Sequence, residues 1–183
     1  MKDTITIAVY CSAVADLPEH WQRGARATGA WIGARRATLV YGGVDAGLMT
    51  TVARATHEAG GRVVGVVPTR RRDWASPYND IVVPTSDLNE RKGTMQLLAD
   101  AFVVLPGGYG TLDEFSTSFS YINFTDQPDK HIVLFNPDGL YDPLLEQLQR
   151  MVDAGLLRPS AMDILRVVTE PEQITEALDE IFK

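Results

Sequence analysis

An apolar run, a glycine-rich turn and an amphipathic run follow one another without a break near the middle of the chain. The apolar run covers 101–105, the turn reads Pro106-Gly107-Gly108-Tyr109-Gly110-Thr111, and the amphipathic run covers 112–124. This order is typical of a strand, a tight turn and a helix. The glycines remove the Cβ atoms that would hold a ligand away from the backbone. Because ligands of parallel α/β sheets bind where strands end and helices begin, the stretch predicts both a fold class and a site.

This turn has two interpretations. We expect the amides of Gly110 and Thr111 to lie at the helix N-terminus, where the helix dipole favours an anion such as phosphate. Glu114 follows three residues into the expected helix, close to any group bound there. A purely structural interpretation stays open, because Thr111-x-x-Glu114 also matches a capping box, in which the glutamate closes back on the threonine amide.

The rest of the chain repeats the alternation of strand and helix. Strands are expected over 4–11, 37–41, 62–67, 80–84, 131–135 and 164–168, and helices over 18–34, 48–59, 141–154 and 172–182, with one more that is capped by Ser86 or Asp87 and ends near Leu98. The alternation predicts one Rossmann-like α/β domain over 1–183, a three-layer fold with a central parallel sheet covered by helices on both faces. The segment 69–79 has no period, and we expect a mobile loop over the carboxyl edge of the sheet.

A second glycine-rich turn, Gly42-Gly43-x-x-x-Gly47, follows the strand 37–41. One such turn is a weak signal, but two in one sheet open on the same edge. Gly42 and Gly43 are therefore candidate ligand-binding residues. Ser12 ends the first strand at this edge, where its hydroxyl either meets a ligand or caps the following turn.

Composition narrows the classes of partner. The net charge of −7 argues against binding to a nucleic-acid backbone. The single cysteine, Cys11, and three widely spaced histidines indicate no metal site. No apolar run is long enough to cross a membrane and the first residues lack the apolar region of a signal peptide, so a soluble cytoplasmic protein is expected. The basic run Arg70-Arg71-Arg72 fits either a solvated loop or contact with one small phosphate.

Arg91 and Lys92 stand side by side before the central strand. Together they could neutralise a phosphate or polarise a purine nitrogen. The alternative is two solvated charges in a first helical turn, although cations are disfavoured at that end of a helix.

Glu90-Arg91-Lys92, followed by the run from Pro106 to Glu114, resembles the LOG ("lonely guy") family of cytokinin riboside 5′-monophosphate phosphoribohydrolases. The signature of that family is an Arg-Lys pair ahead of PGGxGTxxE. The first glycine turn and the later segment Asn136-Pro137-Asp138-Gly139-Leu140-Tyr141 are also similar to the family, so the resemblance covers nearly the whole chain.

The resemblance implies a Rossmann-like fold, a homodimer or larger assembly, and hydrolysis of the N-glycosidic bond of an adenine nucleotide monophosphate without a metal or organic cofactor. It implies that Arg91 and Glu114 are the catalytic pair. The expected substrate-binding residues are Lys92, Gly107, Gly108, Tyr109, Gly110, Thr111, Ser12, Gly42, Gly43 and Asn89. Many relatives are labelled lysine decarboxylases, but a pyridoxal-phosphate decarboxylase needs a Schiff-base lysine and a much larger fold.

The chemistry of the residues agrees with these roles. Departure of a purine leaves positive charge on the ribose, which the Glu114 carboxylate can stabilise while it orients or deprotonates water. Arg91 can hold the purine or the phosphate. The glycine turn can fix the 5′-phosphate, so that remote binding energy is used at the reacting carbon.

Several positions depart from the family pattern. Val44 and Thr50 stand where the first loop has glycines, Leu88-Asn89 replaces Met-His, and 69–79 carries three arginines in place of a glutamate. These departures leave the base open between N6-prenylated adenine, plain AMP and another monophosphate.

Two other functions are compatible with the fold. A nucleotide or molybdenum-cofactor carrier shares it together with a related glycine turn. An interaction protein on an inert scaffold would leave the two turns and the Arg-Lys pair unexplained. The apolar surface of the helix 112–124 is wide, because Tyr121 and Phe124 lie off its main stripe, and we expect a dimer through this helix.

Overall fold

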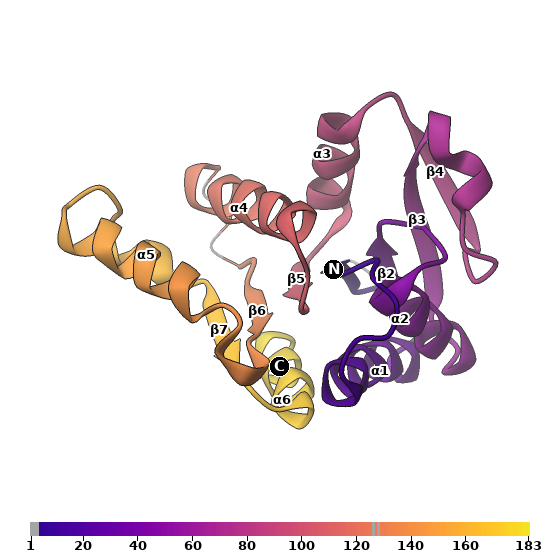
Figure 1. Ribbon diagram of the computed structural model, residues 1–183, viewed down its shortest axis with the longest axis horizontal. Coiled ribbons are helices and arrows are strands. Elements are labelled where there is room, and N and C mark those ends of the chain that lie inside the picture. The colour runs from indigo at the N-terminus through magenta and orange to yellow at the C-terminus, as the bar shows by residue number, and fades with distance from the viewer. Residues whose placement is uncertain (1–3, 126, 128) are drawn as a thin grey trace.

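Seven parallel strands form one central sheet in the computed structural model, which describes residues 4–125, 127 and 129–183 (Figure 1). The strand order is β4-β3-β2-β1-β5-β6-β7, and every neighbouring pair is parallel. The strands are β1 Thr6–Tyr10, β2 Thr38–Tyr41, β3 Arg62–Pro68, β4 Ile81–Thr85, β5 Ala101–Val104, β6 Ile132–Phe135 and β7 Leu165–Val168.

Helices cover both faces of this sheet (Figure 1). The α-helices are α1 Glu19–Ala34, α2 Gly47–Glu58, α3 Leu88–Leu98, α4 Tyr109–Phe124, α5 Asp142–Asp153 and α6 Pro171–Ile181. Short 3₁₀ helices are η1 Thr69–Trp74, η2 Pro137–Gly139 and η3 Pro159–Met162. Among the described residues no helix is both long and apolar enough to span a bilayer.

The hydrophobic core is divided in two by the sheet. Ile7 and Val9 of β1 point into the cluster beneath α1, α2 and α6, whereas Ala8 and Tyr10 point into the cluster beneath α3, α4 and α5. Alternate residues of a strand face opposite sides, so a strand covered on both faces is apolar throughout, as the sequence indicated. The predicted three-layer α/β fold is confirmed.

The order of the strands reverses between β1 and β5, which are neighbours although a long stretch of chain separates them. The Leu105 amide donates to the Tyr10 carbonyl at 2.9 Å, and the Ser12 amide donates to the Pro106 carbonyl at 3.0 Å. In open α/β sheets such a switch point creates the crevice in which ligands bind. The glycine turn after β5 therefore lies at the position that the topology favours for a site.

Two local predictions were wrong. The helix α4 begins at Tyr109, three residues before the expected start, with Gly108 as its N-cap. Glu114 is consequently the sixth residue of the helix. The segment after β3 was expected to be irregular, but Thr69–Trp74 forms the 3₁₀ helix η1.

Candidate active site at the carboxyl edge of the sheet

A buried ion pair joins α3 to α4. Arg91 Nη1 lies 2.6 Å from Glu114 Oε1, and the two side chains are 11% and 9% exposed. Arg91 Nε donates to the carbonyl of Val66, near the end of β3, at 3.0 Å. The guanidinium is thus fixed by a helix on one side and by a strand on the other, and it fixes Glu114 in turn.

Gly42 makes room for this guanidinium. A Cβ atom added to Gly42 would lie 2.3 Å from Arg91 Nη2, whereas Gly42 itself has no positive φ. The first glycine of the turn after β2 is therefore required by the close approach of Arg91, not by its own backbone conformation. Sequence reasoning assigned Gly42 to ligand binding and missed this contact.

Burial raises the pKa of the Glu114 carboxyl, and the neighbouring Arg91 charge offsets only part of that effect. Burial raises the pKa of two neighbouring groups, Tyr10 and Cys11, and the Glu114 charge raises it further. Both groups are therefore neutral at neutral pH. Tyr10 Oη and Ser118 Oγ are 2.8 Å apart, one helical turn beyond Glu114. A carboxylate with a raised pKa is a stronger base than an ordinary glutamate, as a general base at neutral pH requires.

The turn after β5 leaves an open helix N-terminus. In the described part of the chain, the amides of Tyr109, Gly110 and Thr111 donate to no acceptor. A Cβ atom added at Gly108 or Gly110 would meet nothing within 4 Å, so these glycines border free space. This turn therefore forms a cradle for an anion. It offers free amides at the positive end of a helix dipole, and it contains two glycines that no contact within the protein requires.

The remaining residues of this turn support the cradle. Gly107 lets the Thr111 side chain approach, since an added Cβ would lie 2.1 Å from Thr111 Oγ1. Thr111 is buried, and the Tyr109 side chain is 88% exposed. The capping-box interpretation was wrong, because Gly108 is the N-cap and the Glu114 carboxylate contacts Arg91.

The turn after β2 is closed by the chain itself. Gly43 has a φ of 75° and packs against Gly65 and Val67 in β3. The Leu48 amide, in the first turn of α2, donates to the Ser12 carbonyl at 3.0 Å. Ser12 Oγ accepts from the Val14 amide at 3.0 Å and so caps the turn after β1. Gly43 and Ser12 thus make structural contacts at the edge of the site.

Lys92 and Asn89 both lie on α3. Lys92 Nζ donates to both carboxylate oxygens of Asp113 at 2.8 Å, so two consecutive cations of α3 meet two consecutive carboxylates of α4. Asn89 is exposed, and its backbone N–H donates to the carboxylate of Asp87, the N-cap of α3. Sequence reasoning missed Asp113, although the adjacent Asp113-Glu114 pair is a signal that would have found it. In the described ranges, no three His, Cys, Asp or Glu side chains are grouped as a metal site requires.

Comparisons with known proteins place the chain in a family. Residues 49–178 match the family model described as possible lysine decarboxylase. The cytokinin riboside 5′-monophosphate phosphoribohydrolase of Mycobacterium tuberculosis is 40% identical over 167 residues, which are 89% of this chain and 87% of that protein. The enzyme of the same name from Mycobacterium marinum is 38% identical over 174 residues, which are 94% and 92% of the two chains.

Solved structures resemble the fold. The molybdenum cofactor binding protein of Rippkaea orientalis superposes with a TM-score of 0.77 over 100% of both chains, at 21% identity, which shows the fold alone. The relatives of higher identity decide the family. The chain belongs to the LOG family of cytokinin riboside 5′-monophosphate phosphoribohydrolases, within the broader group whose model carries the lysine decarboxylase description.

Proposed function

We propose that this protein hydrolyses the N-glycosidic bond of adenosine 5′-monophosphate, with or without an N6 substituent, to free base and ribose 5-phosphate. The observation that carries the proposal is the buried Arg91–Glu114 pair beside an open helix N-terminus. The names of the curated relatives support it, since they describe phosphoribohydrolases of a riboside 5′-monophosphate.

The proposed substrate is anchored by its phosphate. The free amides of Tyr109, Gly110 and Thr111 receive the phosphate oxygens at the positive end of the α4 dipole. Gly108 and Gly110 allow the phosphate to approach the backbone, because no side chain fills that space. Binding energy gained there holds the ribose over Glu114, where it contributes to the reaction.

Glu114 and Arg91 divide the chemistry. The bond between ribose C1′ and the base nitrogen breaks, and its electron pair leaves with the base, which takes up a proton from solvent. The Glu114 carboxylate stabilises the positive charge that develops on the ribose and accepts a proton from the water whose oxygen bonds to C1′. The Arg91 guanidinium holds Glu114 in place and offsets negative charge on the departing base.

The test is release of base. Wild-type protein and the Glu114→Gln variant are incubated separately with AMP and N6-isopentenyladenosine monophosphate, and the products are separated by chromatography. Free base from the wild type and a rate lower by about 10²–10⁴ in the variant are the expected result. Tight binding without release from either nucleotide would overturn the proposal and favour a carrier of nucleotide or molybdenum cofactor.

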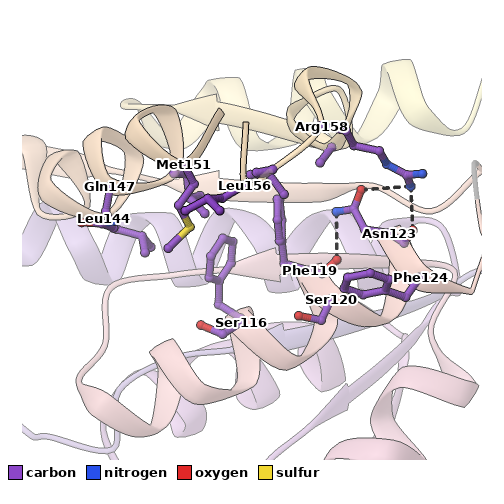
Figure 2. Close-up of a pocket in the computed structure, with 14 residues that line it drawn as sticks. Ser116, Phe119, Ser120, Asn123, Phe124, Leu144, Gln147, Met151, Leu156 and Arg158 are labelled. Atoms are coloured by element: carbon purple, nitrogen blue, oxygen red, sulfur yellow. Dashed lines mark hydrogen bonds between the residues drawn. The ribbon is translucent and has the colours of Figure 1, made fainter. Parts of the chain in front are cut away.

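We further propose that the protein is a homodimer joined through α4. A groove of about 500 Å³ runs between α4 and α5 and is lined by apolar side chains that include Phe119 and Leu148 (Figure 2). Phe124 and Leu156, at its rim, are 86% and 81% exposed. Exposed apolar surface of this kind is typical of an interface.

Light scattering tests the dimer. A mass of twice the 20.1 kDa chain is expected at micromolar concentration. Phe124→Asp should yield the monomer, whereas the control Leu97→Asp, at a 72% exposed residue of α3, should leave the mass unchanged. A monomeric wild type would contradict the proposal.

A further inference from the structure

The 3₁₀ helix η1 carries the basic run that the proposed reaction does not use. Arg70, Arg71 and Arg72 are all exposed, and none has an ion-pair partner among the described residues. The Arg71 guanidinium lies over the Trp74 ring, 4.1 Å from its centroid, and Trp74 is 57% exposed. Arg70, Arg71 and Trp74 line a shallow hollow. Unpaired donors and an aromatic ring are thus presented together on an acidic protein.

The structure holds η1 beside the candidate active site. The backbone carbonyl of Trp74 accepts a hydrogen bond from the Asp45 amide at 3.1 Å, and the Ser76 amide donates to the Gly43 carbonyl at 2.8 Å. These bonds tie η1 and the residues after it to the turn that begins at Gly42, against which Arg91 lies. Arg70 is also only four residues beyond Val66, so the Cα atoms of Val66 and Arg70 are at most about 15 Å apart. The Val66 carbonyl is the one that binds Arg91.

The order of the strands gives the direction of a bound nucleotide. The phosphate cradle follows β5, whereas the Arg91–Glu114 pair reaches the ends of β2 and β3. Three strand spacings separate β5 from β3, about 14 Å in total, which is comparable to the length of an extended nucleoside monophosphate. With its phosphate on the turn after β5 and its ribose over Glu114, the nucleotide extends its base toward η1.

We propose that Arg70, Arg71 and Trp74 contact the far edge of the base and make the enzyme prefer an adenine with a free N6 amino group over one with an apolar prenyl substituent. The inference rests on the proposed function. Adenine offers ring nitrogens that accept hydrogen bonds from a guanidinium, and a π-face that stacks on Trp74 or Arg71. A prenyl tail in the same place would strip water from the guanidinium groups without supplying an acceptor, which is unfavourable.

The first experiment compares kcat/KM for AMP and N6-isopentenyladenosine monophosphate. The wild type should favour AMP by about tenfold or more, the equivalent of one hydrogen bond to a charged group. Arg70→Ser/Arg71→Ser should lower that ratio toward one, mainly through loss of activity on AMP. The control, Arg62→Ser/Arg150→Ser, removes the same charge from the opposite end of β3 and from α5, and it should retain the wild-type ratio. A wild type that favours the prenylated nucleotide, or a ratio that the Arg70/Arg71 variant leaves unchanged, would overturn the inference.

A binding experiment separates this inference from the proposed function. Calorimetry with the Glu114→Gln protein measures the Kd of each intact nucleotide whether or not the wild type hydrolyses it. Tighter binding of AMP that disappears when Arg70 and Arg71 are also replaced supports the role of η1, even if no base release is found. Equal Kd values for the two nucleotides would count against it, even if hydrolysis is confirmed.

Discussion

Replacing Gly42 with alanine tests the geometry of the catalytic pair without touching either of its members. The added Cβ would lie 2.3 Å from Arg91 Nη2 and 3.0 Å from Met49 Sδ. To restore ordinary van der Waals contact, the guanidinium must move by about 1 Å. Alanine can adopt the backbone conformation of Gly42, because the φ angle of Gly42 is not positive.

A shift of that size breaks the alignment of Arg91 with Glu114, whose present distance is 2.6 Å, and with the Val66 carbonyl at 3.0 Å. A misplacement of about 1 Å can lower a rate by about 10²-fold, so kcat for base release should fall by roughly that factor. The melting temperature should decrease as well, because the shift weakens a buried ion pair.

Gly108→Ala is the matched control. Its Cβ would meet no protein atom within 4 Å, so folding and kcat should be kept while KM rises as the phosphate loses its approach to the backbone. Steady-state kinetics and thermal unfolding of both variants provide the comparison. If Gly42→Ala retained the wild-type kcat, the reasoning that Gly42 positions Arg91 for catalysis would be refuted.

Three further predictions concern the buried polar groups. Because burial raises the pKa of Glu114, kcat/KM should fall on the acid side at a pH above the ordinary glutamate value of about 4.3, as a pH–rate profile would show. The same shift means that, between the ordinary and the raised pKa, native Glu114 retains a proton that the unfolded chain has lost. The stability that this proton contributes is present below the ordinary pKa and is lost as the pH rises through the raised pKa. Urea unfolding should show this decline in the free energy of unfolding for the wild type but not for Glu114→Gln. Ser118→Ala should lower the free energy of unfolding by about 1–3 kcal/mol, because it leaves the buried Tyr10 hydroxyl without a partner. Tyr10→Phe should lower it less, since Ser118 Oγ also accepts a hydrogen bond from Gln96 Nε2 at 3.3 Å. Denaturant unfolding of the two variants measures the difference.

The sequence predicted the fold because each strand is a nearly continuous apolar run bounded by turn residues, a pattern with few alternatives in a chain of alternating elements. Helix ends were less certain. The amphipathic run placed the start of α4 at Leu112, yet the helix begins at Tyr109 with Gly108 as its N-cap. Gly108 makes no side-chain capping bond, so no capping side chain in the sequence marks where this helix begins.

The candidate site was predicted in its residues but not in its contacts. Arg91 and Glu114 were named together, and the structure places them 2.6 Å apart. The pairing of Lys92 with Asp113 and the role of Gly42 depend on how α3 docks against α4 and on how closely Arg91 approaches the sheet. Such distances follow from packing between elements distant in sequence, which periodicity does not encode. The catalytic and substrate-binding roles themselves stay predictions.

The closed turn after β2 has a consequence for the size and polarity of the ligand. Backbone carbonyls of Ser12 and Val14 face Gly47 at the start of α2, where an incoming anion would otherwise be received. Folds of this kind can bind a dinucleotide across the crevice, with one half of the sheet and its helices contacting each part of the ligand. Here the chain's own oxygens cover part of one half, and the Leu48 amide is already bonded to Ser12, so the start of α4 is the more open of the two helix ends. If the proposed function is right, this asymmetry favours a mononucleotide, bound by its one terminal phosphate at α4, over a dinucleotide whose phosphates lie at its centre.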